Sequence, residues 1–321
     1  MKNSRLNLTA SSCCVCGTDD AEQIGQGRDY EYDTTDDLFA AYQCRSCQLV
    51  YLNPRPQMSD METIYPPEYH AFDFSEKKFG FVYKVRSRLE ANRLIANCGS
   101  LPDGARILDV GCGDGFHLRL LREYGNKTWS LEGVDLDRRA VEAAEKSGIA
   151  VHYGSVDVLD LPGDHYDLIF MIQTIEHVER PDVVLRSVYR FLKPGGRIVV
   201  VTDNTGSIDF GLFKRRYWGG YHFPRHLNLF NKFSLTKLAE KVGFSMVEMT
   251  TIVSPVNWVY SFHNALVDKK APGFLINRFT LRSVASLSAF TLLDIVLQKT
   301  NHGALLQATL RKPMEAPDVG T

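Results

Sequence analysis

The residues with the clearest chemical potential form a glycine-rich segment, residues 109–115, with the sequence DVGCGDG. Glycine has no Cβ, so this turn can bend sharply and let a ligand approach the backbone closely. Further along the chain, Asp135 ends a second apolar run. This spacing is typical of the carboxylate that binds ribose hydroxyls in nucleotide-binding βαβ units. Together the two features predict an adenosine-type ligand at the carboxyl ends of parallel strands.

Two other interpretations of the glycine segment remain open. The glycines could serve only close packing between a strand and a helix. They could also belong to a dinucleotide site, but that fingerprint has the spacing G-x-G-x-x-G and leaves a helix N-terminus open for a pyrophosphate. Here the glycines alternate at 111, 113 and 115, and Asp109 and Asp114 would repel a pyrophosphate. A sulfonium ligand with a free amino group would be accommodated.

Residues 109–115 resemble the first motif of the class I S-adenosylmethionine-dependent methyltransferases, and the likeness extends over about two-thirds of the chain. The resemblance implies a Rossmann-like, doubly wound α/β fold whose seven-stranded, mostly parallel sheet has an antiparallel last strand. It also implies that the glycine turn holds the methionine part of the cofactor, Asp135 the ribose and Asp157 the adenine edge. The cofactor-binding residues carried over in this way are Asp109, Gly111, Cys112, Gly113, Gly115, Asp135, Leu136, Asp157, Val158 and Gln173.

Four cysteines near the N-terminus form two C-x-x-C pairs, Cys13 with Cys16 and Cys44 with Cys47. Four thiolates at this spacing satisfy tetrahedral zinc at about 2.3 Å per bond and leave no open position, so the site is expected to be structural. A redox pair is the alternative, but redox motifs normally lie at a helix start beside a strand, whereas these pairs precede turns. Cys14 is then a spare thiol. A zinc module before a class I core is similar to bacterial methyltransferases of sugar, polysaccharide and secondary-metabolite pathways.

Methyl transfer requires alignment of the reactants and removal of a proton from the acceptor. The first candidate base is His177, which follows the predicted fourth strand. The second is His226, in the aromatic loop 217–227, whose sequence YWGGYHFPRHL suits a sugar or ring acceptor. Each has a structural alternative: Glu176 and His177 could pack or start a helix, and the loop could form a satellite core with His226 capping the next turn. The basic residues 214–216 could clamp a phosphate or form a solvated face.

The predicted reaction is methyl transfer to an oxygen, or less favourably a carbon or nitrogen, of a small acceptor such as a sugar or a lipid-linked sugar. A non-catalytic module that binds an adenosine ligand and recruits a partner through its zinc unit is the alternative from another class. A nicotinamide oxidoreductase is a third.

Alternating strands and helices must position these residues, and the pattern predicts a parallel sheet covered on both faces. The predicted strands are Arg106–Val110, Ser130–Val134, Ala150–Tyr153, Tyr166–Ile172, Arg197–Thr202, Ser245–Thr251 and Ala304–Leu310. The predicted helices are Phe79–Asn97, Phe116–Tyr124, Arg138–Ser147, Asp182–Leu192 and Ser234–Val242.

The domain organisation predicted from these elements has three parts. Residues 1–60 form the zinc module, residues 61–100 a connector and helix, and residues 101–321 the methyltransferase domain. Insertions on the substrate side are expected at about 203–232 and 253–301. Within the second insertion, residues 274–297 combine arginines with a wide apolar face, so this helix could cover the acceptor pocket or rest on a membrane.

The composition of the chain indicates which cellular location and which kinds of partner are expected. The 37 basic and 38 acidic residues give no overall field that would attract nucleic acid. The N-terminal residues lack the apolar segment of a secretory signal, and cysteines clustered for metal suit a reducing compartment, so a cytoplasmic location is expected. The longest uncharged apolar stretch, Ser283–Leu293, is too short to span a bilayer.

Overall fold

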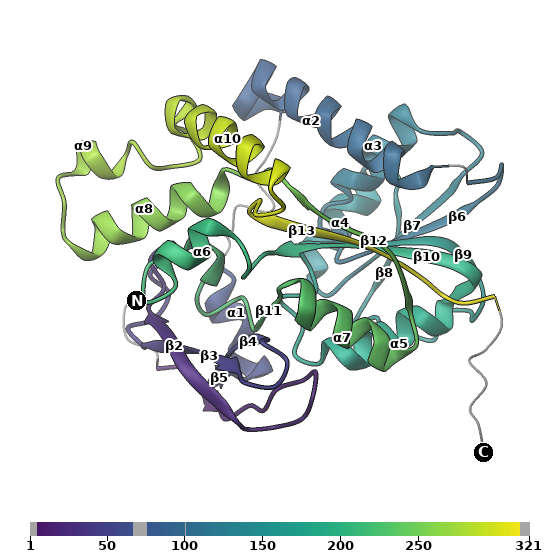
Figure 1. Cartoon of the computed structure of the whole chain (residues 1–321). Helices are drawn as coiled ribbons and strands as arrows, with labels where there is room; N and C mark the ends of the chain where they lie inside the picture. Colours follow the sequence, from purple (N-terminus) through teal and green to yellow (C-terminus); the bar gives the residue numbers. More distant parts are fainter. Residues whose placement is uncertain (1–4, 67–75, 100, 315–321) are drawn as a thin grey trace.

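A computed structural model describes residues 5–66, 76–99 and 101–314 of the chain (Figure 1). Its centre is a seven-stranded sheet with the order β12-β13-β10-β9-β6-β7-β8. The five parallel strands are β6 (Arg106–Val110), β7 (Ser130–Asp135), β8 (Ala150–Tyr153), β9 (Tyr166–Ile172) and β10 (Leu192–Asp203). The other two strands are β12 (Ser245–Ile252) and β13 (Leu305–Arg311), and β13 runs antiparallel to both of its neighbours.

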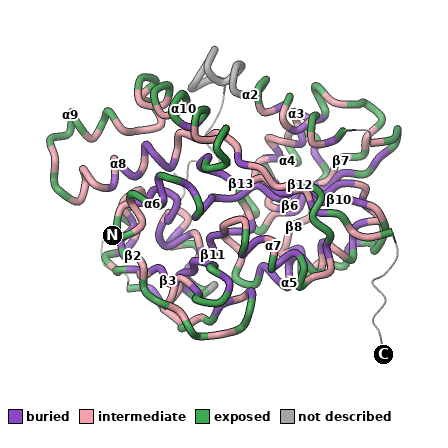
Figure 2. The backbone as a smooth tube through the Cα atoms, in the orientation of Figure 1, coloured by how far each residue is buried: buried purple, intermediate pink, exposed green. Residues whose placement is uncertain are grey.

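Helices cover both faces of this sheet because each buried strand is apolar on both sides. Alternate residues of β9 show the division: Leu168 and Phe170 pack toward one face, whereas Ile169 and Met171 pack toward the other. The first face is covered by α2 (Glu76–Cys98) and α3 (Phe116–Tyr124), and the second by α5 (Pro181–Phe191) and α7 (Lys232–Val242). At the far edge, α4 (Arg138–Lys146) contacts β7 and β8. Figure 2 shows the buried backbone concentrated in these strands.

The predicted fold is confirmed, including its antiparallel last strand. Three strands (β6, β8 and β9) and helix α3 have the predicted bounds. The main difference is β10, which begins at Leu192 rather than Arg197 because Leu192 already pairs with Tyr166 of β9, and the Gly-containing turn before Arg197 forms a register shift. The predicted connector includes residues 67–75 and 100, which lie outside the described residues.

The N-terminal cysteine region contains two small sheets. In the first, β1 (Leu8–Thr9) pairs with β5 (Arg55–Pro56). The second has the order β11-β4-β3-β2 and comprises β2 (Ala21–Gly27), β3 (Phe39–Cys44), β4 (Val50–Leu52) and β11 (Asn228–Leu229). The edge strand β11 comes from the segment after β10. The cysteine region is therefore joined to the central domain by a shared sheet and not only by the connector. Beside it lie η1 (Met58–Asp60) and α1 (Met61–Ile64).

The two predicted insertions contain further helices. The first contains α6 (Ile208–Phe213) and η3 (Gly219–Tyr221), and the second contains α8 (Val256–Asp268), α9 (Gly273–Ile276) and α10 (Val284–Lys299). In Figure 1 the α8–α10 segment projects away from the sheet. Of the helices in the second insertion, α8 contacts the aromatic loop, and α10 packs against α8. In the part of the chain described, no helix is both long enough and apolar enough to cross a membrane.

Candidate functional site

The glycine segment turns sharply at the end of β6. Gly111, Gly113 and Gly115 all have positive φ, at 75°, 55° and 77°. A Cβ at Gly111 would lie 2.4 Å from Oγ1 of Thr174, so a larger residue would collide with the turn after β9. A Cβ at Gly113 would meet nothing within 4 Å. The backbone at Gly113 is therefore exposed to open space, as a ligand cradle requires.

Asp109 is fully buried at the end of β6, and neither of its carboxylate oxygens has a hydrogen-bond partner among the described residues. The nearest cation candidate is His117, whose Nδ1 lies 3.6 Å from Oδ2. A buried carboxylate without partners is costly, so a cationic or hydrogen-bonding ligand is expected to satisfy it. The amino group of S-adenosylmethionine would offer this carboxylate a positive charge and hydrogen-bond donors.

Asp135 lies beside Gly113, and its carboxylate is already oriented. It accepts hydrogen bonds of 2.8 Å from the backbone N–H groups of Gly113 and Asp137. Two large apolar side chains nearby in sequence are open to solvent: Leu136 is 54% exposed and Val158 is 81% exposed. They follow the ends of neighbouring strands β7 and β8, where an adenine ring would cover them. Asp157 accepts a hydrogen bond from Ser155 in the same turn.

Asp114 differs from the sequence-based expectation. Its carboxylate pairs with Arg119 of α3 at 2.9 Å and accepts a hydrogen bond from the backbone of Phe116. Its charge is therefore balanced locally. Of the two acids expected to repel a pyrophosphate, only Asp109 remains without a hydrogen-bonded cation.

The turn after β9 connects the glycine segment to a buried carboxylate. Thr174 donates a hydrogen bond to the carbonyl of Val110, 3.1 Å away, and Gln173, with φ of 51°, donates through its side chain to Glu176. Glu176 is fully buried and also accepts a hydrogen bond of 2.8 Å from Thr202. Burial raises the pKa of Glu176 to about 7.

Three histidines lie together on the substrate side of this turn. The ring centroid of His226 is 4.5 Å from that of His177 and 5.0 Å from that of His222. Burial lowers the pKa of His177 to about 4. Burial, followed by the neighbouring histidines, lowers the pKa of His226 well below its usual range. Both side chains are therefore neutral near pH 7, which is the state that accepts a proton.

The neighbours of His226 define its tautomer. Its Nδ1 lies 2.8 Å from the carbonyl of Gly220 and 3.3 Å from Oδ2 of Asp203. The carbonyl of Gly220 can only accept, so the proton belongs on Nδ1 and the lone pair on Nε2. Burial, followed by the nearby charge of Glu176, raises the pKa of Asp203 well above its usual range, so the contact with Gly220 defines the tautomer. His177 is less constrained, because its Nδ1 lies 3.0 Å from the hydroxyl of Tyr65 and 3.2 Å from the carbonyl of Arg225.

The same cluster contains a group of ligand atoms that could hold a metal ion. One atom each from Glu176, His177 and His226 lies within 4.8 Å of the others. The carboxylate of Glu176 already has two hydrogen-bond donors in Thr202 and Gln173, so a cation would compete with these contacts.

A buried ion pair holds the aromatic loop on the cysteine region. Arg225 is 1% exposed, and its guanidinium contacts both carboxylate oxygens of Asp29 at 3.2 and 2.8 Å. Its Nε donates to the carbonyl of Ile64. Next to this pair, His222 Nδ1 lies 2.9 Å from a carboxylate oxygen of Glu31. The acids Asp29, Glu31 and Asp203 were not among the site residues predicted from sequence, because nothing local marks them as partners of a loop so distant in the chain.

The remaining residues of the loop support its structural interpretation. Trp218, Tyr221 and Phe223 are buried in a satellite core with Phe39 and Leu52 of the cysteine region. They do not present a free aromatic surface to a ring acceptor. In the basic segment before the loop, Arg216 pairs with Asp268 at 3.1 Å. A small concavity beside the loop is lined by Arg28, Tyr30, Glu31, His222 and Asn264, among others.

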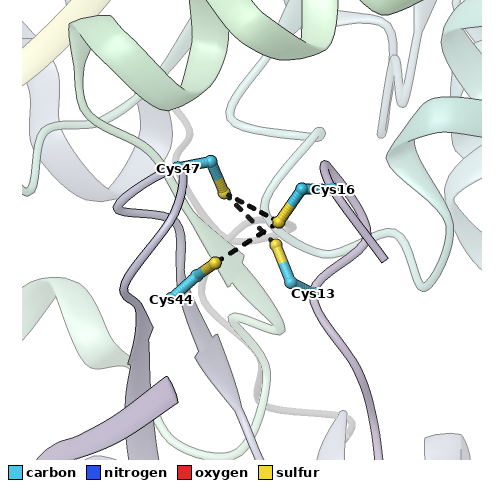
Figure 3. A group of neighbouring side chains, drawn as sticks. All are labelled: Cys13, Cys16, Cys44 and Cys47. Atoms are coloured by element: carbon cyan, nitrogen blue, oxygen red, sulfur yellow. Dashed lines mark hydrogen bonds between the residues drawn. The ribbon is translucent and has the colours of Figure 1, made fainter. Parts of the chain in front are cut away.

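The four cysteines of the two C-x-x-C pairs converge, as Figure 3 shows. The Sγ–Sγ distances are 3.3 Å from Cys13 to Cys47, 3.4 Å from Cys16 to Cys44 and 3.7 Å from Cys16 to Cys47. A tetrahedral Zn²⁺ with bonds of about 2.3 Å requires sulfurs roughly 3.8 Å apart, so small shifts would fit the ion. Cys14 lies outside the group, with its thiol 3.3 Å from Oδ1 of Asn228.

The sheet order and the glycine turn define the class I fold of S-adenosylmethionine-dependent methyltransferases. A methyltransferase-domain family model matches residues 81–249, more than half of the chain, and the protein belongs to this family. It is an S-adenosylmethionine-dependent methyltransferase.

Individual proteins that are similar to this chain share about a third of its residues or fewer over the matched segments. The ubiquinone biosynthesis O-methyltransferase of Cereibacter sphaeroides (strain KD131) is 28% identical over 171 residues, covering 50% of this chain and 68% of the relative. That of Bordetella avium is 33% identical over 119 residues, covering 35% and 48%. Phosphoethanolamine N-methyltransferase 2 of Haemonchus contortus, solved with S-adenosyl-L-methionine, has a TM-score of 0.53 at 16% identity, covering 91% of this chain and 68% of that one. The last likeness shows the shared fold.

Proposed function

We propose that this protein transfers a methyl group from S-adenosylmethionine to a hydroxyl of a small ring-shaped acceptor, with His226 as the general base. The observation that carries this proposal is the tautomer of His226: the carbonyl of Gly220 holds the proton on Nδ1 and leaves the lone pair on Nε2. Thr174 hydrogen-bonds the end of β6, and His177, three residues further on, contacts His226, which supports a base near the proposed cofactor cradle.

The cofactor, when bound, supplies an activated methyl group on its sulfonium. In this proposal the ten residues carried over from the family resemblance bind it, with Asp109 satisfying its amino group, Asp135 its ribose, and Leu136 and Val158 its adenine. As the acceptor oxygen forms its bond to the methyl carbon and the sulfur–carbon bond breaks, the hydroxyl proton passes to Nε2 of His226. His177 stays neutral beside it and orients the acceptor, since protonation of both rings at this distance would be unfavourable.

Two classes of acceptor fit this proposal. A sugar or lipid-linked sugar fits the family resemblance of the cysteine region. The names of the curated relatives, ubiquinone biosynthesis O-methyltransferases, favour oxygen as the methylated atom and a precursor of a quinone as the acceptor. We infer that the methylated group in both classes of acceptor is a hydroxyl on a ring. The non-catalytic and nicotinamide alternatives receive no support from the family match.

The test is turnover of labelled S-adenosylmethionine by the purified protein with two acceptor panels, nucleotide- and lipid-linked sugars in one and ring phenols in the other. Label transfer to a hydroxyl of either panel, at a rate reduced in His226→Gln, supports the proposal and selects the acceptor class. Transfer to carbon or nitrogen alone, or binding of S-adenosylhomocysteine without turnover by any panel, would reject it.

We further propose a structural zinc ion bound by Cys13, Cys16, Cys44 and Cys47. In this proposal residues 1–60 form the zinc module, residues 61–100 connect it, and residues 101–321 form the catalytic domain. Support comes from the convergence of the four sulfurs and from Lys241 of α7, whose Nζ donates to the carbonyls of Cys14 and Val15. The ion would therefore stabilise a region that the central domain already contacts.

A further inference from the structure

Helix α10 is apolar, yet of its sixteen residues only Asp294 is buried. Its outer face presents Leu292, 67% exposed, and Val296 one turn further on. Exposed large apolar side chains continue at the start of α10 and around α9. They are Phe274, Leu275, Val284, Leu292, Leu293, Ile295 and Val296. We name these seven residues the apolar crest. Exposed apolar side chains gathered on one segment in this way mark interaction surfaces.

The inner face of α10 packs against the rest of the protein. The exposure of the crest is therefore not the result of a poorly packed helix. Phe290 stacks on Trp258 of α8 with ring centroids 5.7 Å apart and an interplanar angle of 7°. The buried carboxylate of Asp294 accepts hydrogen bonds from the backbone N–H groups of Ser254 and Ala304. Gln298 donates to the carbonyl of Thr251 at the end of β12. The orientation of α10 is thus set from its inner side, and the crest faces outward.

The charges around the crest have one sign. Residues 253–304 contain two acids, of which Asp294 is buried and Asp268 pairs with Arg28 and Arg216. The exposed charged residues of this segment are all basic: Lys269, Lys270, Arg278, Arg282 and Lys299. None of these five forms an ion pair with another described residue. The whole chain carries a net charge of only −1, so the positive charge of this surface is a local feature.

We propose that the apolar crest and its basic rim dock the protein on the surface of an anionic lipid bilayer, with α10 lying parallel to the membrane plane. Apolar side chains flanked by Arg282 before the helix and Lys299 in its last turn suit insertion at the headgroup boundary, with the cations reaching the phosphates. At sixteen residues, α10 is too short to span a bilayer. A second copy of the chain fits less well, because a symmetric contact would bring two basic rims together.

Docking would also orient the proposed acceptor site relative to the membrane. On its other side α8 contacts the aromatic loop, where Ser261 accepts a hydrogen bond of 2.8 Å from the backbone of Gly219, and Asn264 lines the concavity beside His222. The crest therefore lies on the same helical layer that borders the proposed acceptor site. The docking itself does not depend on the proposed reaction.

The experiment is co-sedimentation of the full chain with vesicles of phosphatidylcholine alone or mixed with phosphatidylglycerol, at low and high salt. We expect binding to the mixed vesicles, weakened by salt. Leu292→Gln with Val296→Gln should reduce the partition coefficient at least about tenfold, and Arg278→Glu with Arg282→Glu at least as much. Leu38→Gln, which changes an equally exposed apolar residue elsewhere, and Lys146→Glu, which reverses a distant exposed charge, should bind as the wild type does.

Circular dichroism and sedimentation equilibrium on each variant distinguish the remaining outcomes. A wild-type chain that stays in solution with both vesicle types overturns the proposal. So does a wild-type dimer that Leu292→Gln with Val296→Gln converts to monomer, because the crest would then be a contact between copies. Failure of methyl transfer would leave the vesicle result unaffected.

Discussion

Asp109 and Asp135 show two ways in which a carboxylate at a strand end is prepared for a ligand. Asp135 is held by two backbone N–H groups, so its orientation is fixed before anything binds. Asp109 is buried and has no hydrogen-bond partner in the described chain, so a ligand that supplies one gains the free energy otherwise lost by desolvation. Beside Asp135, the backbone of Gly113 borders open space.

Asp135→Ala is expected to weaken binding of S-adenosylhomocysteine by about 1–3 kcal/mol, because charge-assisted hydrogen bonds to the ribose would be lost. Calorimetric titration measures the change. Glu145→Ala, an exposed acid on α4, is the matched control and should bind normally. An unchanged affinity in Asp135→Ala would remove this residue from the cofactor site.

His226→Gln is expected to lower kcat by roughly 10²–10⁴-fold while leaving the affinity for S-adenosylhomocysteine unchanged, since the base acts only on the acceptor. Steady-state rates and titration on the same preparation separate the two effects. If the variant keeps full activity and His177→Gln does not, the roles of the two histidines are reversed.

The depressed histidine pKa values also predict the pH profile. A histidine accepts a proton only when neutral, so activity is lost as pH falls through its pKa. With the pKa of His226 lowered by burial and that of His177 lowered to about 4, protonation of neither histidine should lower kcat/KM as pH falls from 8 to 6. A step near pH 7 would report Glu176 in the same cluster, whose pKa burial raises to about 7. A half-maximal rate near the ordinary histidine value of about 6.5 would show that the base is a more exposed group.

At the scale of elements, the loop between β10 and β11 depends on contacts distant in sequence. Arg225 carries a buried charge whose main partner, Asp29, belongs to the cysteine region. The same loop contributes the adjoining histidines and leads into β11, the edge strand of the small sheet. A change at this ion pair should therefore alter both the stability of the protein and the placement of the proposed base.

Arg225→Met alone and Asp29→Leu alone should each destabilise the protein by about 3–5 kcal/mol, because each leaves a buried charge uncompensated. The double variant should recover a large part of that loss. Urea unfolding measures all three. Lys237→Ala with Glu240→Ala, an exposed pair on α7, should change the free energy of unfolding by less than about 1 kcal/mol. Strict additivity of the two single changes would show that the pair is not coupled.

At the scale of the whole molecule, the cysteine region and the central domain share a sheet, a hydrophobic cluster and the Arg225–Asp29 pair. Cys13, Cys44 and Leu49 pack in the same cluster as Leu108, Ile169 and Phe230. A metal ion at the four cysteines would thus stabilise more than a peripheral appendage. Loss of that ion is expected to affect the surface on which the aromatic loop rests.

Cys44→Ser should release the zinc ion and lower the melting temperature, because three thiolates with a hydroxyl bind the ion far less tightly. Elemental analysis and thermal unfolding on the same sample test both effects. Cys14→Ser is the control, since this thiol lies outside the group and should leave the metal content unchanged. Metal content that is the same in Cys44→Ser and the wild type would reject the four-cysteine site.

Local sequence by itself determined the central sheet, the glycine turn and the paired cysteines. Strand and helix periodicity, glycines that need positive φ, and the C-x-x-C spacing act over a few residues, so β9 and α3 have their predicted bounds and Asp109 its predicted place. Only the tertiary structure decided that Glu31 would face His222, that β11 would complete a sheet begun in the N-terminal region, and that the apolar face of α10 would point outward. These features depend on contacts between segments far apart in the chain, and the free energy of such contacts comes from burial and charge pairing that neither segment's sequence encodes alone.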